Sequence, residues 1–175
     1  MRRITLLRHA KSDWNSPTRS DFDRPLNDRG QRDAPRMGQQ LLKRGLHPQL
    51  VLSSPAVRAI TTARIVAAQL GCSASAIQTV DALYLASPKQ ILQVLNKHAA
   101  KQTDVLLVGH NPGLTDLANL ICDARIDNLP TCGAFSVELH AGDWSTIGNG
   151  AGKLAWFDYP KGIATPDEVR QSGSD

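Results

Sequence analysis

Short apolar segments, too continuously hydrophobic to have a solvated face, alternate along this chain with segments of helical periodicity. Strands are predicted at residues 3–7, 49–53, 77–80, 104–109, 134–139 and 153–157. Strands that are buried on both faces are typical of parallel sheets, whose crossover helices cover each side. The alternation therefore predicts an α/β fold: a three-layer α/β/α sandwich around a largely parallel central sheet.

The last two predicted strands are separated by a Gly-rich, partly polar loop. Strands that follow one another this closely can pair as an antiparallel meander, whereas a parallel pair needs a longer crossover. We therefore expect an antiparallel edge on the sheet.

Three of the predicted helices begin with an N-cap residue that is followed by proline. The three pairs are Ser54-Pro55, Ser87-Pro88 and Asn111-Pro112, and apolar residues recur at helical spacing after each. A further helix is predicted near residues 30–44. Pro35 either kinks this helix or moves its start to a later residue.

The chain of 175 residues has the size of one domain, and no repeat or second domain is visible. We predict that residues 1–160 form this domain and that residues 161–175 form a flexible C-terminal tail with almost no apolar anchor. The longest apolar runs fall far short of the ~20 residues that a membrane span needs. Because the N-terminus also lacks the apolar region of a signal peptide, we expect a cytoplasmic protein without a membrane partner.

The cysteine pattern and the charge pattern narrow the possible partners. Cys72, Cys122 and Cys132 are widely spaced and form no CxxC or metal-ligand pattern, so we predict reduced thiols that help to fill the core. The net charge of +4 favours anionic partners, but the Lys and Arg residues are scattered and form no basic run. A small anion therefore fits better than a nucleic acid.

Charged and titratable side chains follow the ends of predicted strands. Arg8 and His9 end the first strand, Arg58 lies in the first turn of the helix after Ser54-Pro55, and His110 follows the strand at 104–109. Ligands of parallel sheets bind outside the carboxyl ends of the strands, near helix N-termini, so these side chains are expected to meet there.

Each of these residues alone has an ordinary structural interpretation, as a surface arginine, a turn residue or a strand-end histidine. Together, two cations beside a positive helix end would repel one another unless an anion lay among them. A phosphoryl group is the anion whose tetrahedral oxygens suit forked guanidinium groups. The sequence therefore predicts a phosphate site.

No P-loop, metal-ligand cluster or carboxylate pair is evident in the sequence, so a histidine is the candidate for chemistry on the phosphate, with no metal and no cofactor expected. Neutral imidazole is a good nucleophile near pH 7. His9 is the better placed of the two histidines, and His110 would donate a hydrogen bond to a phosphoryl oxygen. We predict two steps, in which the phosphoryl group moves to His9 and water then removes it.

The segment LLRHAKSDWN resembles the N-terminal signature of the histidine phosphatase superfamily, which has the phosphoglycerate-mutase-like fold. SSPAVRAITTA and VGHNPG resemble its second and third motifs, in the same order, and the match spans about residues 3–158. DFDRPLNDRG and LPTCGAFSVEL are similar to the SixA-type phosphohistidine phosphatases. The resemblance implies that His9 is the phosphorylated nucleophile and that Arg8, Arg58 and His110 bind the phosphoryl group. It also implies Arg24 and Asn15 as additional substrate contacts.

The chain departs from the family pattern in two places. Ala10 stands where the superfamily usually has glycine, which affects little beyond the local backbone. Members that act on phosphate esters resemble one another in a glutamate that serves as general acid, but the corresponding stretch here reads DALYLASP, with Leu85 at the aligned position. Asp81 could substitute for the missing acid, or it could be a cap or turn residue.

Predicted helices and strands fill nearly all of the 52 positions from Arg58 to His110, leaving no room for the lid insertion that seals small-substrate mutases of the family. An open pocket could admit a phosphorylated side chain on a protein surface. The main hypothesis is a metal-independent phosphatase that acts on phosphohistidine in proteins. The alternatives are a broad phosphatase for small phosphate esters or anhydrides and a non-catalytic phosphate-binding module; a mutase would need a closed site.

Overall fold

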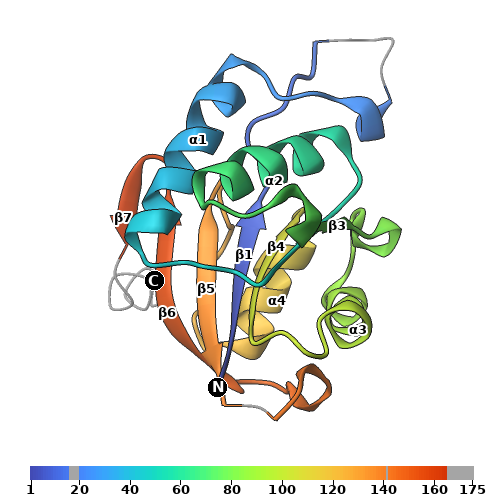
Figure 1. The fold of residues 1–175 in the computed structure, drawn as a ribbon, viewed down its shortest axis with the longest axis vertical. Helices are drawn as coiled ribbons and strands as arrows, with labels where there is room; N and C mark the ends of the chain where they lie inside the picture. The colour runs from blue at the N-terminus through green and yellow to red at the C-terminus, as the bar shows by residue number, and fades with distance from the viewer. Residues whose placement is uncertain (16–19, 141, 165–175) are drawn as a thin grey trace.

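The computed structural model describes residues 1–15, 20–140 and 142–164 of the chain (Figure 1). Within these residues the centre is a seven-stranded sheet in the order β3-β2-β4-β1-β5-β6-β7. The strands are β1 (Arg2–Arg8), β2 (Leu50–Ser53), β3 (Ile77–Thr79), β4 (Asp104–Gly109), β5 (Ala134–Leu139), β6 (Gly152–Tyr159) and β7 (Gly162–Ala164). All six predicted strands are confirmed, and β7 is an addition.

The sheet has a parallel half and an antiparallel half. Strands β3, β2, β4 and β1 pair in parallel. Strand β5 runs antiparallel to β1, and β6 and β7 continue the antiparallel pairing outward. The expected parallel sheet with an antiparallel edge is confirmed, and the antiparallel part includes one strand more than predicted.

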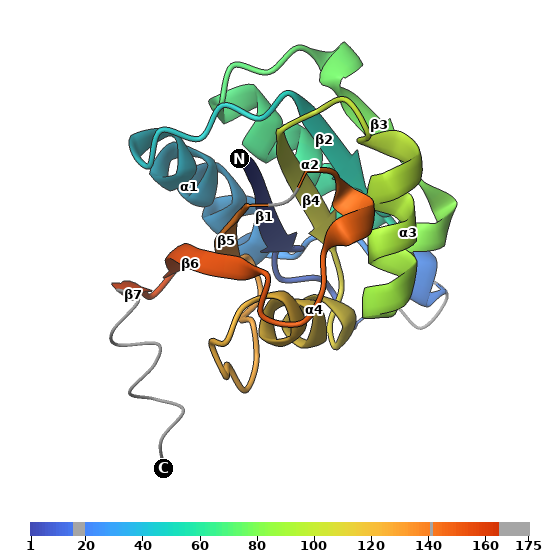
Figure 2. The same ribbon diagram turned by 90° about the horizontal axis from the view of Figure 1, so that it is seen from below.

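Helices cover both faces of the sheet, which confirms the three-layer sandwich (Figure 2). The four α-helices of the described chain are α1 (Asp28–Lys43), α2 (Val57–Gln69), α3 (Pro88–His98) and α4 (Gly113–Ile121). Side chains alternate between the two faces of each strand. In β1, Ile4 and Leu6 belong to the core with α3 and α4, whereas Leu7 belongs to the core with α1 and α2. Both faces of the sheet are buried, and this explains why the strands are continuously apolar.

Helix α3 starts as the sequence predicts. The Ser87 side chain accepts a hydrogen bond from the backbone N–H of Gln90, and the Gln90 side chain accepts one from the backbone N–H of Ser87. This reciprocal capping box satisfies two N–H groups that the helix leaves unpaired.

The predicted starts of α2 and α4 are wrong by two residues and by one residue. Helix α2 begins at Val57, because the Ser54 hydroxyl bonds to the His110 ring and to a loop N–H, not to the first turn of the helix. Helix α4 begins at Gly113, after Asn111-Pro112. Ser54 therefore does not mark the start of α2, whereas the Asn111 side chain still accepts a hydrogen bond from the backbone N–H of Thr115 in the first turn of α4.

Helix α1 starts earlier than expected, at Asp28. The Asn27 side chain accepts a hydrogen bond of 2.9 Å from the backbone N–H of Gly30 and so caps the helix. Pro35 lies inside the helix, so the alternative in which it moves the helix start to a later residue is wrong.

The cysteines pack as predicted. Among the described residues no disulfide is present; Cys122 and Cys132 are buried, and Cys72 is half-buried against the core beneath α1 and α2. The prediction of thiols that help to fill the core is confirmed.

The predicted C-terminal tail begins with an ordered pairing. Residues Gly162–Ala164 form β7 on the edge of β6. Residues 165–175 lie outside the described residues, so the expectation of a flexible tail stays a prediction for them. In the described part of the chain, no helix combines the length and the apolar character that crossing a membrane requires.

Candidate active site

The carboxyl ends of the central parallel strands lie side by side and deliver the predicted site residues. Arg8 at the end of β1 is paired with Gly109 at the end of β4, and the backbone N–H of His9 donates to the Gly109 carbonyl. The rings of His9 and His110 therefore approach to 5.3 Å between centroids. Arg58 reaches the same place from the first turn of α2.

These side chains border a cavity of about 290 Å³ at that edge of the sheet. Its lining consists of Arg8, His9, Lys11, Ser12, Trp14, Asp21, Arg24, Arg58, Leu85, His110, Asn111 and Thr131. We call this cavity the phosphate pocket. The structure thus brings Arg8, His9, Arg58 and His110 together, and Arg24 joins them.

The geometry fixes the protonation state of His9. Its Nδ1 lies 2.8 Å from the carbonyl oxygen of Ala10, and because a carbonyl only accepts, Nδ1 carries the proton. Burial is the largest of the effects that lower the pKa of His9 to about 4, and the nearby Arg58 and Arg8 add to it. The ring is neutral at pH 7, with an unprotonated Nε2.

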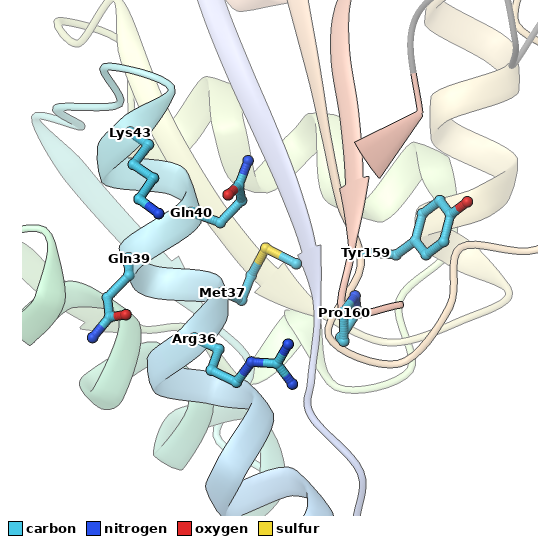
Figure 3. A pocket seen from close by; sticks show the side chains of 7 residues that line it. All are labelled: Arg36, Met37, Gln39, Gln40, Lys43, Tyr159 and Pro160. Atoms are coloured by element: carbon cyan, nitrogen blue, oxygen red, sulfur yellow. The ribbon is translucent and has the colours of Figure 1, made fainter. Parts of the chain in front are cut away.

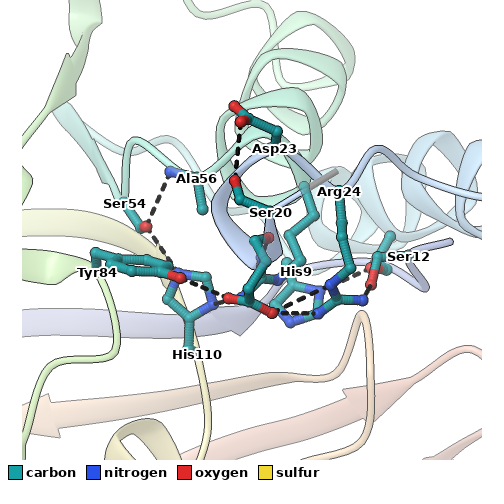
Figure 4. Close-up of polar contacts among 12 residues, drawn as sticks. His9, Ser12, Ser20, Asp23, Arg24, Ser54, Ala56, Tyr84 and His110 are labelled. Atoms are coloured by element: carbon teal, nitrogen blue, oxygen red, sulfur yellow. Dashed lines mark hydrogen bonds and ion pairs between the residues drawn. The ribbon is translucent and has the colours of Figure 1, made fainter. Parts of the chain in front are cut away.

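His110 has the opposite tautomer. Its Nδ1 lies 3.3 Å from Nη2 of Arg58, and since a guanidinium only donates, Nδ1 is the acceptor. The proton is therefore on Nε2, which donates to the Ser54 hydroxyl at 2.7 Å (Figure 4). Burial first, and then the charge of Arg58, lower the pKa of His110 to about 3, so this ring is also neutral.

Arg58, which is buried, and Arg8, which is half-buried, each keep one buried donor atom without a partner in the described chain. Nη1 of Arg8 donates to the Leu129 carbonyl at 3.0 Å, and Nη1 of Arg58 donates to the Asp21 carbonyl at 2.6 Å. Among the described residues, neither arginine's Nε has a hydrogen-bond partner. Burial, and then the charge of Arg58, lower the pKa of Arg8. Buried donors are almost always paired, so two unpaired ones at the same pocket point to an anionic ligand.

Asp21 is a site residue that the sequence analysis missed. It starts a short 3₁₀ helix, η1 (Asp21–Asp23), and its carboxylate accepts hydrogen bonds from Arg24, Arg58 and the hydroxyl of Tyr84, at 3.1, 3.1 and 2.5 Å. The Tyr84 hydrogen bond is the first of the effects that lower the pKa of Asp21 to about 2. The carboxylate is thus ionised and orients the two guanidinium groups.

Tyr84 was also missed, and its ring meets the His110 ring edge-on at 5.5 Å between centroids. The Asp21 carboxylate raises the pKa of the Tyr84 hydroxyl. The one signal available for Asp21 was its place in DFDRP, three positions before Arg24. Nothing local marks Tyr84, because its partner is 63 positions away.

The two implied substrate contacts have different positions. Arg24 is buried, donates to the Ser12 hydroxyl at 2.5 Å and has its guanidinium carbon 3.4 Å from the ring centroid of Trp14. Asn15 does not line the phosphate pocket; its backbone N–H donates to the Asp13 side chain, and it is exposed. The structure therefore does not bring Asn15 to the other site residues.

The structure also separates Leu85 from Asp81. Leu85 lines the phosphate pocket, with 56% of its surface exposed and a left-handed backbone φ of 50°. Asp81 begins η3 (Asp81–Leu83) and lines a different depression, beside α3. Asp21 is the one carboxylate among the described lining residues, so the geometry does not favour Asp81 as a general acid.

No cluster of three or more His, Cys, Asp and Glu side chains in the described ranges is suited to hold a metal ion. The positive charges among the described lining residues of the pocket come from three guanidinium groups, those of Arg8, Arg24 and Arg58, and from the ammonium group of Lys11. Together, the fold and the site define an α/β protein with an arginine-lined pocket at the carboxyl edge of its sheet and a neutral histidine among the lining residues.

Comparisons with known proteins agree with this class. The family model of the histidine phosphatase superfamily (branch 1) matches residues 4–84. A crystal structure from Agrobacterium tumefaciens that carries the name phosphohistidine phosphatase SixA is 30% identical, with a TM-score of 0.74 over 91% of this chain and 98% of that chain. The chain belongs to the histidine phosphatase superfamily, and these matches support phosphatase activity.

Two relatives extend the similarity along the chain. An uncharacterized protein of Mycobacterium tuberculosis (strain H37Rv) is 32% identical over 165 residues, covering 89% of this chain and 100% of the relative. An uncharacterized chloroplastic protein of Arabidopsis thaliana is 29% identical over 174 residues, covering 95% of this chain and 78% of the relative.

Proposed function

We propose that this chain hydrolyses phosphohistidine on proteins through a phosphorylated His9, without a metal ion. The observation that carries the proposal is the hydrogen bond from Nδ1 of His9 to the Ala10 carbonyl. It leaves the Nε2 lone pair available for attack, in a pocket where Nε of Arg8 and Nε of Arg58 need an acceptor. A nucleophile and an anion clamp in one cavity are what phosphoryl transfer requires.

In the first step, Nε2 of His9 attacks the phosphorus atom while the bond from phosphorus to the substrate's imidazole breaks. The arginine donors take up the charge on the equatorial oxygens. The Nδ1–H of His9 stays on the Ala10 carbonyl and stabilises the positive charge that develops on the phosphorylated ring.

In the second step, water attacks the phosphorus, the bond from phosphorus to Nε2 breaks, and inorganic phosphate leaves. The proton that the water loses goes to solvent or to a phosphate oxygen. His9 returns to its neutral state with the proton still on Nδ1, so no metal-bound hydroxide is needed.

The choice of leaving group rests on Asp21. A carboxyl with a pKa of about 2 is ionised at neutral pH and cannot donate a proton to a departing alkoxide. Phosphohistidine avoids this requirement, because its ring takes a proton from solvent at the second nitrogen and leaves as neutral imidazole.

The rim of the pocket favours a substrate with apolar surroundings. Trp14 and Leu85 line the mouth with 70% and 56% of their surfaces exposed, and Phe22, 37% exposed, packs edge-on against Tyr84. The backbone of Leu85 has a left-handed φ, which costs about 1 kcal/mol or more of conformational free energy in a residue other than glycine. The fold accepts this cost and holds the Leu85 side chain at the rim of the pocket. A polar floor with an apolar rim suits a phosphorylated side chain on a protein surface, and the name of the Agrobacterium tumefaciens relative supports the same substrate.

The test is a substrate panel assayed with the full chain in EDTA. It compares a phosphohistidine peptide, acetyl phosphate, an aryl phosphate and an alkyl phosphate such as glycerol phosphate. We expect kcat/KM to rank the phosphohistidine peptide first and the alkyl ester last, lower by a factor of roughly 10²–10⁴ for want of an acid. Brief incubation with acetyl phosphate should leave an acid-labile phosphoryl adduct on His9.

Asp81→Asn is the matched control, because Asp81 lies outside the phosphate pocket, and it should leave the ranking intact. Equal rates on glycerol phosphate and the phosphohistidine peptide would favour the alternative, a broad ester phosphatase. Anion binding with neither adduct nor turnover would indicate a phosphate-binding module.

A further inference from the structure

Ser54 faces His110 and does not cap α2. It lies between β2 and α2, is fully buried, and places Oγ 2.7 Å from Nε2 of His110 (Figure 4). The same oxygen accepts the backbone N–H of Ala56 at 3.2 Å. A buried hydroxyl with these two partners holds the His110 ring by its inner nitrogen.

The outer nitrogen of His110, Nδ1, holds a lone pair that accepts from Nη2 of Arg58. We expect an anion in the phosphate pocket to compete with His110 for the Nη2 donor of Arg58, which leaves the Nδ1 lone pair facing negative oxygen atoms. A lone pair in that position is repelled, whereas a proton on Nδ1 would make a charge-assisted hydrogen bond to the anion. His110 can donate to a phosphoryl group only with a proton on Nδ1. The ring proton could move there from Nε2 only if the Ser54 hydroxyl turned to donate to Nε2; otherwise the proton comes from solvent.

Burial makes the largest contribution to the cost of that proton, and the charges around His110 add to it or reduce it. Arg58 on α2, Arg8 at the end of β1 and His9 directly after it oppose it, whereas Asp21 on η1 favours it. The Tyr84 ring, after η3, meets His110 edge-on, and its hydroxyl is engaged with Asp21. A bound dianion adds two negative charges to this balance and so favours the imidazolium.

We infer that anion binding in the phosphate pocket takes up one proton at Nδ1 of His110, and that Ser54 is the positioning residue that keeps the other ring proton on Nε2. The proton comes from solvent, and no other bond is made or broken. The inference rests on the proposed function only in that the pocket is a phosphate site. Hydrogen bonds from a charged ring are stronger than those from a neutral one, so the Ser54 acceptor favours the protonated state.

The test is a calorimetric titration of the full chain with sulfate near pH 7, in buffers of different ionisation enthalpy. Sulfate is a dianion at this pH, so any proton taken up goes to the protein. We expect about one proton per bound sulfate. His9→Ala should keep this uptake and His110→Gln should lose it, which separates the two histidines.

Ser54→Ala should weaken sulfate binding roughly ten- to hundredfold, the usual loss for a hydrogen bond to a charged group, and should reduce the proton uptake. Ser54→Thr keeps a hydroxyl and should restore part of both. Ser53→Ala is the matched control: it removes another buried hydroxyl, one that donates to the Ser54 carbonyl and does not touch His110.

Ring ¹⁵N spectra of the wild type check the same inference without any substitution. His110 should change from the neutral Nε2–H tautomer to the imidazolium as sulfate is added. Sulfate binding without proton uptake, or uptake that vanishes in His9→Ala and persists in His110→Gln, overturns the inference and leaves the proposed function standing. A failure of sulfate to bind at all overturns the phosphate site itself and the inference with it.

Discussion

The phosphate pocket and the cleft between α1 and the end of β6 have nearly the same size, about 290 and about 280 Å³ (Figure 3). Both contain basic side chains: Arg36 and Lys43 border the cleft beside α1, whereas Arg8, Arg24 and Arg58 border the pocket. Size and charge therefore do not distinguish a binding site from an ordinary surface depression here.

The two regions differ in whether their buried charges are matched. Beside α1, the buried Asp158 accepts hydrogen bonds from Arg44 at 2.9 and 2.8 Å and from Gln40 at 3.2 Å. In the phosphate pocket, Asp21 matches only the outer atoms of Arg58, and both buried Nε donors stay unpaired. A charge whose hydrogen bonds are all made within the protein, such as that of Asp158, stabilises the fold. Buried donors without a partner destabilise the free protein and can stabilise a bound ligand.

The largest expected effect is on catalysis in the phosphate pocket. His9→Ala should lower turnover of the phosphohistidine peptide by at least about 10³-fold, because the nucleophile is lost. Tungstate or vanadate should still bind, since both arginines remain. Turnover within about tenfold of the wild type, roughly 1.4 kcal/mol, would exclude the covalent mechanism.

Arg58→Lys keeps the charge in the pocket and removes the planar fork. We expect a loss of about 2–4 kcal/mol in transition-state stabilisation, measured as kcat/KM, because an ammonium cannot span two phosphoryl oxygens. Arg36→Lys makes the same change in the cleft beside α1, where the side chain is 62% exposed, and should have no effect. Equal effects of the two substitutions would remove the distinction between the two regions.

A change in the hydrogen-bond network of Asp158, Arg44 and Gln40 should lower the stability of the fold and leave catalysis unchanged. Asp158→Asn removes the charge that Arg44 and Gln40 bind, and should lower the free energy of unfolding by about 1–3 kcal/mol in urea denaturation. Activity per folded molecule should stay at the wild-type level. A loss of activity without a loss of stability would mean that the network acts on the pocket.

The smallest effect is in the pH dependence. His9 must be neutral to attack, and burial lowers its pKa to about 4, so protonation removes the nucleophile only as the pH falls through about 4. At that pH about half of the free enzyme should be inactive, and near neutral pH none of it. Ring ¹⁵N spectra of the free protein measure the titration directly; a midpoint near the ordinary value of about 6.5 would contradict the effect of burial.

The sequence alone revealed the order of elements, because its signals are local. The apolar runs mark strands that are buried on both faces, and Ser87 and Gln90 cap α3 within a single turn. It also placed Arg8, His9, Arg58 and His110 at the carboxyl edge of the sheet. That placement needed only the rule for strand ends and the resemblance of the motifs.

The tertiary structure decided what these residues do to one another. Asp21 meets Arg58 across 37 positions and Tyr84 across 63, and Ser54 meets His110 across 56. It also left Asn15 and Asp81 outside the phosphate pocket and paired β7 with β6. Propensity and capping depend on neighbours a few residues apart, whereas tautomers, matched charges and shifted pKa values depend on atoms that only packing brings together.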